Sequence, residues 1–147
     1  MKLYTIGYGG RSKEELIYLL NEHEIKRIVD VRLRPDKSSM GIWVKAKTSD
    51  KGIEKLFHDY NISYISLPEL GNIFYEYEDW DKRYKLLLEK SGDLLFERLK
   101  NIKEPYCLMC AEKQASGCHR KIIAEHLSQI TSYQIEHIEN KSLKKER

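Results

Sequence analysis

The chain has 147 residues, of which 41% are hydrophobic and 33% are charged, and its formal net charge at pH 7 is +3. A chain of this length fits one domain with a hydrophobic core of its own. The small positive charge does not by itself require a nucleic-acid partner, and no apolar run approaches the roughly 20 residues that span a bilayer. The first residues lack the apolar segment of a signal peptide, so we expect a cytoplasmic protein without membrane association.

The number and position of the cysteines indicate the redox state of the cellular compartment. The chain has three cysteines, all in its last third. Secreted disulfide scaffolds pair even numbers of cysteines, whereas cytosolic proteins keep their thiols reduced. We therefore expect reduced thiols.

The first half of the chain alternates short β-rich runs with amphipathic segments. Ser12, followed three residues later by Glu15, predicts the start of a helix. The hydrophobic patterns predict strands over 3–8, 27–31 and 63–67, and helices over 12–23 and 50–60.

The second half continues the alternation. Two helices are expected between residues 77 and 102, separated at Ser91-Gly92. A nearly apolar run over 105–110 predicts a central strand buried on both faces. A helix over 118–129 and a strand over 133–138 complete the expected domain of residues 1–138, and the charged residues 139–147 are expected to form a disordered tail.

This alternation predicts an α/β fold, a single three-layer domain with a mainly parallel sheet of about five strands and helices on both faces. Ligands of such sheets bind beyond the carboxyl ends of the strands. The corresponding positions are Gly7 and Tyr8, Asp30 and Arg32, residues 67–71, and residues 110–120.

The segment 110–120 carries the strongest chemical signal. It joins the buried strand to a helix whose first turn holds Cys118, His119 and Arg120. A helix amino terminus attracts anions and favours a thiolate. Arg120 offers a planar fork for phosphate or carboxylate, and His119 can transfer a proton. Glu112 is either a base or the ion-pair partner of Arg120.

We therefore predict an anion-receiving pocket with two sets of residues. Its catalytic candidates are Cys110, Glu112, Cys118 and His119, and its substrate-binding candidates are Gly7, Tyr8, Asp30, Arg32 and Arg120. Structural roles are the alternative, with Cys118 packed beneath the helix, Glu112 paired with Arg120, and Asp30 paired with Arg32 at the strand end.

The cysteine spacing raises a metal site as another alternative. Cys107 and Cys110 have the spacing of a zinc knuckle, but strand residues three apart point to opposite faces, so Cys107 is predicted to lie in the core. Cys110, Cys118 and His119 are ligand types that zinc accepts, and a fourth ligand is missing. No metal and no cofactor is therefore assigned.

Two further segments have competing interpretations. The basic segment 32–51 surrounds Trp43 and can clamp a nucleotide or a single nucleic-acid strand by charge and stacking, or it is a solvated loop. The glycines after Tyr8 can let a ligand approach the backbone. The turn after the third predicted strand carries Glu69 and Asn72, either of which can line the pocket.

Four motifs together resemble the uncharacterised family of domains of unknown function numbered 488. They are Thr5-Ile6-Gly7-Tyr8, Asp30-Val31-Arg32 with Pro35, Leu67-Pro68-Glu69-Leu70-Gly71, and Cys110-Ala111-Glu112 followed by Cys118-His119-Arg120. The resemblance runs from about Lys2 to Ile138. It implies no activity, but it marks as signature positions Gly7, Tyr8, Asp30, Arg32, Glu69, Gly71, Cys110, Glu112, Cys118, His119 and Arg120.

Three functional hypotheses follow. The first is an enzyme, a hydrolase or transferase for a phosphate-bearing or nucleotide-like anion, with Cys110 or Cys118 as nucleophile and His119 or Glu112 as acid or base. The second is a non-catalytic nucleic-acid-binding module that uses the basic segment 32–51. The third is a metal-dependent enzyme with cysteine and histidine ligands. Substrate, pathway and oligomeric state are not defined by the sequence.

Overall fold

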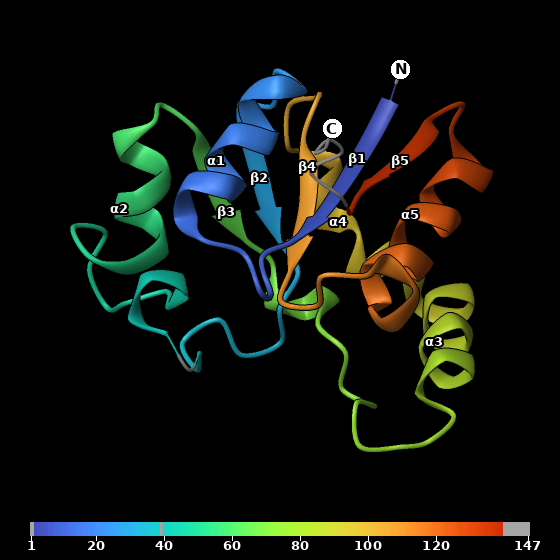
Figure 1. The fold of residues 1–147 in the computed structure, drawn as a ribbon. Coiled ribbons are helices and arrows are strands. Elements are labelled where there is room, and N and C mark those ends of the chain that lie inside the picture. The colour runs from blue at the N-terminus through green and yellow to red at the C-terminus, as the bar shows by residue number, and fades with distance from the viewer. Residues whose placement is uncertain (1, 39, 140–147) are drawn as a thin grey trace, which may run out of the picture.

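A five-stranded, all-parallel sheet forms the centre of the protein in the computed structural model, which describes residues 2–38 and 40–139 (Figure 1). The strand order is β3-β2-β4-β1-β5. The strands are β1 (Lys2–Gly7), β2 (Arg27–Asp30), β3 (Ser63–Ser66), β4 (Cys107–Cys110) and β5 (Gln134–Ile138). The predicted α/β class and parallel sheet are confirmed, whereas all of the tail expected over 139–147 except Glu139 lies outside the described residues.

Helices cover both faces of this sheet, as the alternating pattern predicts. The helices α1 (Lys13–Glu22) and α2 (Gly52–Asp59) enclose one buried cluster with the sheet. The helices α3 (Trp80–Leu95), α4 (Glu97–Lys100) and α5 (His119–Ile130) enclose the other. Short 3₁₀ turns lie at η1 (Gly41–Trp43), η2 (Pro68–Leu70) and η3 (Ala115–Gly117). Within the described ranges, no helix has the length and apolar character to cross a membrane.

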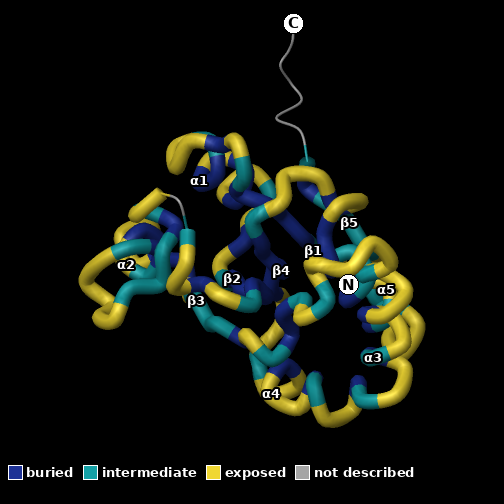
Figure 2. Tube along the Cα trace, turned by 90° about the horizontal axis from the view of Figure 1, so that it is seen from below, coloured by how far each residue is buried: buried dark blue, intermediate teal, exposed yellow. Residues whose placement is uncertain are grey.

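The central strand β4 is buried along its whole length, as Figure 2 shows for the middle of the sheet. Its residues alternate between the two cores, because successive strand side chains point to opposite faces. Cys107 lies in the core beneath α1 and α2, and Cys110 in the core beneath α5. The prediction that Cys107 is a core residue, separated from Cys110 by the sheet, is confirmed.

The expected helix break at Ser91-Gly92 is wrong. The helix α3 continues through both residues to Leu95. Gly92 serves packing here, because a Cβ atom at this position would lie 3.1 Å from Nε2 of His126 on α5. The close approach of two helices explains the glycine, at a helix-propensity cost of about 1 kcal/mol relative to alanine.

The end of β1 packs tightly against the loop that follows β4. Gly7 is the register partner of Cys110, and the backbone N–H of Gly9 donates to the carbonyl oxygen of Ala111 at 2.8 Å. A Cβ atom at Gly7 would overlap the carbonyl oxygen of Glu112. Gly7 and Gly9 thus admit the chain's own loop to the backbone, in the place where the sequence suggested a ligand.

This packing predicts a large difference between two glycine substitutions. Gly7→Ala should lower the free energy of unfolding by about 1–3 kcal/mol, because the added methyl group overpacks a fixed backbone contact. Gly41→Ala is the matched control, since a methyl group added there would have no neighbouring atom within 4 Å. Urea unfolding monitored by circular dichroism measures both, and equal stability of the two variants would refute the tight packing of β1 against the loop.

Candidate functional site

A cavity of about 600 Å³ opens beyond the carboxyl ends of β2 and β4. Three segments line it. They contribute Arg32 to Arg34 after β2, Asn72, Tyr75 and Trp80 before and at the start of α3, and Cys110 to Glu112 with Gly117 to His119 around the start of α5. Its location is the one that parallel α/β sheets favour for ligands. Another cavity of about 600 Å³, beside the edge strand β3, has neither cysteine nor arginine in its lining.

Cys118 sits at the amino-terminal cap of α5. Its sulfur accepts a hydrogen bond from the backbone N–H of Arg120 at 3.4 Å. The Nδ1 atom of His119 lies 3.6 Å from the same sulfur. A helix terminus and an imidazole therefore surround one buried sulfur, which is the environment that activates cysteine.

The hydrogen bonds of His119 define its tautomer. Nε2 lies 2.7 Å from the carbonyl oxygen of Val31, and because a carbonyl only accepts, Nε2 carries the hydrogen. Nδ1 is then left with its lone pair toward Cys118. Burial lowers the pKa of His119 to about 4, so the imidazole is neutral at pH 7. A thiolate on Cys118 would favour the imidazolium and act against this shift.

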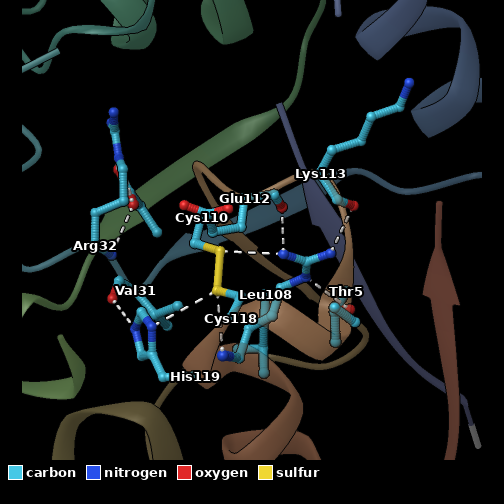
Figure 3. Close-up of a disulfide and its surroundings, with 12 residues drawn as sticks. Thr5, Val31, Arg32, Leu108, Cys110, Glu112, Lys113, Cys118 and His119 are labelled. Carbon is cyan, nitrogen blue, oxygen red and sulfur yellow. Dashed lines mark hydrogen bonds and ion pairs between the residues drawn. A yellow bond between two sulfur atoms is a disulfide. The ribbon is translucent and has the colours of Figure 1, made fainter. Parts of the chain in front are cut away.

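Cys110 contacts Cys118 on one side and a buried arginine on the other (Figure 3). The structure joins the two sulfurs as a disulfide, where the sequence suggested reduced thiols. Nη1 of Arg120 donates to the Cys110 sulfur at 3.1 Å. Cys107 remains a free thiol, and its complete burial raises its pKa above the ordinary value.

Arg120 does not line the cavity, although the sequence placed it among the substrate-binding residues. Its side chain is fully buried. The guanidinium donates to the Thr5 hydroxyl at 3.1 Å and to the carbonyl oxygens of Glu112 and Lys113 at 2.6 and 3.2 Å. The suggested ion pair between Glu112 and Arg120 is absent. Arg120 donates to the backbone carbonyl oxygen of Glu112 instead, and Glu112 lines the cavity.

Asp30, Arg32 and Tyr8 form a buried network next to the cavity. Arg32 donates to Asp30 from Nε at 2.9 Å and from Nη2 at 2.7 Å, and Nη1 donates to the Tyr8 hydroxyl at 3.0 Å. The hydroxyl of Tyr64 donates to the same carboxylate, and burial together with Asp30 raises the pKa of Tyr64. Of these residues Arg32 lines the cavity, so the network positions one wall of it.

Trp43 is buried, with 3% of its surface exposed, and stacks on Tyr8 with ring centroids 4.8 Å apart. Stacking on a nucleic-acid base requires an exposed ring. The proposed aromatic clamp in the segment 32–51 is therefore wrong in this structure. The tryptophan anchors the basic segment to the core instead.

Several lining residues were not predicted from the sequence. Arg34 was assigned only to a basic segment, and Tyr75 and Trp80 to the start of a predicted helix or the residues before it. Their signal is a concentration of aromatic residues between Ile73 and Trp80. Of the two turn residues singled out, Asn72 lines the cavity, whereas Glu69 pairs with Arg98 at 2.7 Å.

The metal hypothesis has less support than the sequence suggested. Across residues 2–38 and 40–139, no three His, Cys, Asp or Glu side chains are grouped as metal ligands. Of the proposed ligands, Cys110 and Cys118 are bonded to each other, and Nε2 of His119 is engaged by Val31.

Comparison with known proteins identifies one family. The family model described as "Domain of unknown function DUF488" matches residues 12–127. No curated protein and no solved structure matches the chain. The matched range includes the whole segment from Cys110 to Arg120, and β1 with Gly7 and Tyr8 precedes it.

The buried, neutral His119 predicts a stability loss in mild acid. Unfolding releases the imidazole to its ordinary pKa near 6.5, so the unfolded state binds the proton first as the pH falls. The stability that the neutral form contributes is fully present above about pH 6.5 and is lost as the pH falls to about 4. The loss in the free energy of unfolding amounts to about 2 kcal/mol at pH 5. His119→Gln keeps an N–H donor for Val31 but has no titratable ring.

Urea unfolding at pH 7 and pH 5 provides the measurement. The wild type should lose about 2 kcal/mol more than His119→Gln between these two values, since all carboxyl groups are common to both proteins. Identical pH dependence would show that His119 is not buried in the neutral form.

Proposed function

The chain belongs to the family of domains of unknown function DUF488, and we propose that it is a thiol-dependent enzyme whose cavity binds a small anionic molecule. The observation that carries the proposal is that Cys110, Cys118, His119 and two arginines line one cavity. A thiol enzyme for an anionic substrate requires a nucleophile, a proton acceptor and a cation, and these residues supply all three.

Arg34 is the cation available to a ligand. Its side chain is 60% exposed, and its contact with Asp36 is long, at 3.4 Å, and open to solvent. Exposed pairs of this kind contribute little and exchange readily. Arg32 also reaches the cavity, but its charge is balanced by Asp30 at 2.7 Å. Arg34 is thus the group best suited to meet a phosphate or carboxylate.

The aromatic part of the cavity wall suggests the shape of the ligand. Tyr75, which is 64% exposed, and Trp80 at the start of α3 both line the cavity. Flat, partly exposed rings favour an apolar or planar group through stacking. A nucleotide-like or aromatic anion satisfies both this wall and Arg34.

Chemistry is centred on Cys118. The Nδ1 lone pair of His119 faces its sulfur, and the first turn of α5 donates an N–H to it. After reduction, proton transfer to Nδ1 would generate a thiolate within the cavity. Glu112 lines the same cavity and is a second acid or base within reach of a bound molecule.

Binding of anions should depend on Arg34. Arg34→Ala should weaken the affinity for the best ligand of a panel of nucleoside monophosphates and phosphate monoesters about tenfold, or about 1.4 kcal/mol. Arg27→Ala is the matched control, because Arg27 begins β2 at the end of the strand remote from the cavity and donates to the carbonyl of Lys103.

Isothermal titration calorimetry measures both affinities, with thermal-shift screening to select the ligand. The affinity of the wild type should also fall with rising salt, since a charge pair forms. Equal affinities of wild type and Arg34→Ala, or no binding of any anion of the panel to the wild type, would overturn the anion site.

A further inference from the structure

The guanidinium of Arg120 is a buried cation whose direct contacts, among the described residues, include no carboxylate. Within the described residues, no carboxylate lies within 4.0 Å of its guanidinium, although its side chain is fully buried. Its contacts are a hydroxyl, two backbone carbonyls and the sulfur of Cys110. Burial lowers the pKa of Arg120 to about 10, which still leaves it charged at pH 7.

A buried charge is costly unless an opposite charge lies beside it. Among the four groups that Arg120 contacts, only the sulfur of Cys110 can become an anion. The Nη1 atom is already placed for that anion, 3.1 Å from the sulfur. In the disulfide form this sulfur is neutral, and the guanidinium has no counter-charge in direct contact.

The surroundings of the two sulfurs therefore differ in kind. Cys110 faces a fixed positive charge, whereas Cys118 faces the neutral imidazole of His119 and one backbone N–H. In thiol–disulfide exchange the better leaving group is the sulfur whose thiolate is more stable. The arrangement makes Cys110 the leaving sulfur and Cys118 the sulfur that is attacked.

We propose that Cys110 and Cys118 form a redox-active pair that catalyses thiol–disulfide exchange with a small anionic thiol, with Arg120 stabilising the Cys110 thiolate. The inference rests on the proposed function for its anion site, because Arg34 would bind the acidic group of the thiol. The acceptor of electrons is the protein disulfide, and a small-molecule disulfide restores it by the reverse exchange.

The reaction balances in two steps. A substrate thiolate attacks the Cys118 sulfur, the bond between Cys118 and Cys110 breaks, and Cys110 leaves as a thiolate beside Arg120. A second substrate thiol then attacks the substrate sulfur of the mixed disulfide, and Cys118 leaves. The proton of this second thiol passes through Nδ1 of His119 to the Cys118 sulfur. One protein disulfide becomes a thiol and a thiolate, and two substrate sulfurs become one disulfide.

The test is an equilibrium in glutathione redox buffers. The fraction of protein in the disulfide form is read by alkylation and mass spectrometry, with buried Cys107 as an internal reference for unfolding. Arg120→Met removes the charge, and Arg120→Lys retains it. We expect Arg120→Met to shift the equilibrium toward the disulfide at least about tenfold, with Arg120→Lys closer to wild type.

If Arg120→Met does not fold, the wild type and a Cys110→Ser variant provide the test. Wild-type protein should cycle between dithiol and disulfide in these buffers, and Cys110→Ser should accumulate glutathione on Cys118. Failure of the wild type to form the disulfide, or an unchanged equilibrium in folded Arg120→Met, overturns the redox pair.

The choice of thiol separates the two proposals. Reduced glutathione is anionic and β-mercaptoethanol is neutral, so Arg34→Ala should slow the reaction with glutathione selectively. Cycling with both thiols at rates that do not depend on Arg34 supports the redox pair and removes the anion site. Binding of anions that depends on Arg34, without cycling, retains the anion site and removes the redox pair.

Discussion

One buried guanidinium holds the candidate site together. Arg120 begins on α5, reaches Thr5 on β1, and fixes the loop after β4 through the carbonyl oxygens of Glu112 and Lys113. The distant strand β1 and the loop just before α5 thus share one set of charge-assisted hydrogen bonds, which are stronger than bonds between neutral groups. The loop can follow this path because β1 ends in glycine, which leaves room for the Glu112 carbonyl.

A buried ion pair lies beside the cavity. Asp30 and Arg32 lie at the end of β2, and the Arg32 guanidinium extends to the Tyr8 hydroxyl and the carbonyl oxygen of Trp43. The two arginines differ in one respect. Arg32 has a carboxylate partner, whereas Arg120 has a sulfur in that place. The charge of Arg32 at the cavity is therefore balanced by a carboxylate, whereas Arg120, buried behind the cavity lining, has no carboxylate in direct contact among the described residues.

Sequence patterns were sufficient for the fold class and for the location of a cavity at the carboxyl ends of the strands. Alternation of period-two and helical spacing predicted the strands, and the apolar run before Cys110 predicted the central strand. The roles of Arg120 and Trp43 could not be predicted from the sequence. A sequence pattern shows the type of a residue but not whether segments distant in the sequence bury its side chain. The same limit explains Gly92, which is a helix breaker in local terms and a contact surface for His126 in the folded protein.

The order of the strands has a consequence for synthesis of the protein on the ribosome. β4 lies between β1 and β2, so the first two strands do not pair with each other, and the strand that joins them is missing until residues 107–110 have been made. The outer strand β5 joins β1 last of all. The nascent chain therefore emerges through residue 106 with the inner edges of its earliest strands uncovered, and long-range pairing of this kind is slow. The two cysteines can therefore come together only after β1, β2 and β3 have been made, because Cys110 ends the strand that joins β1 to β2.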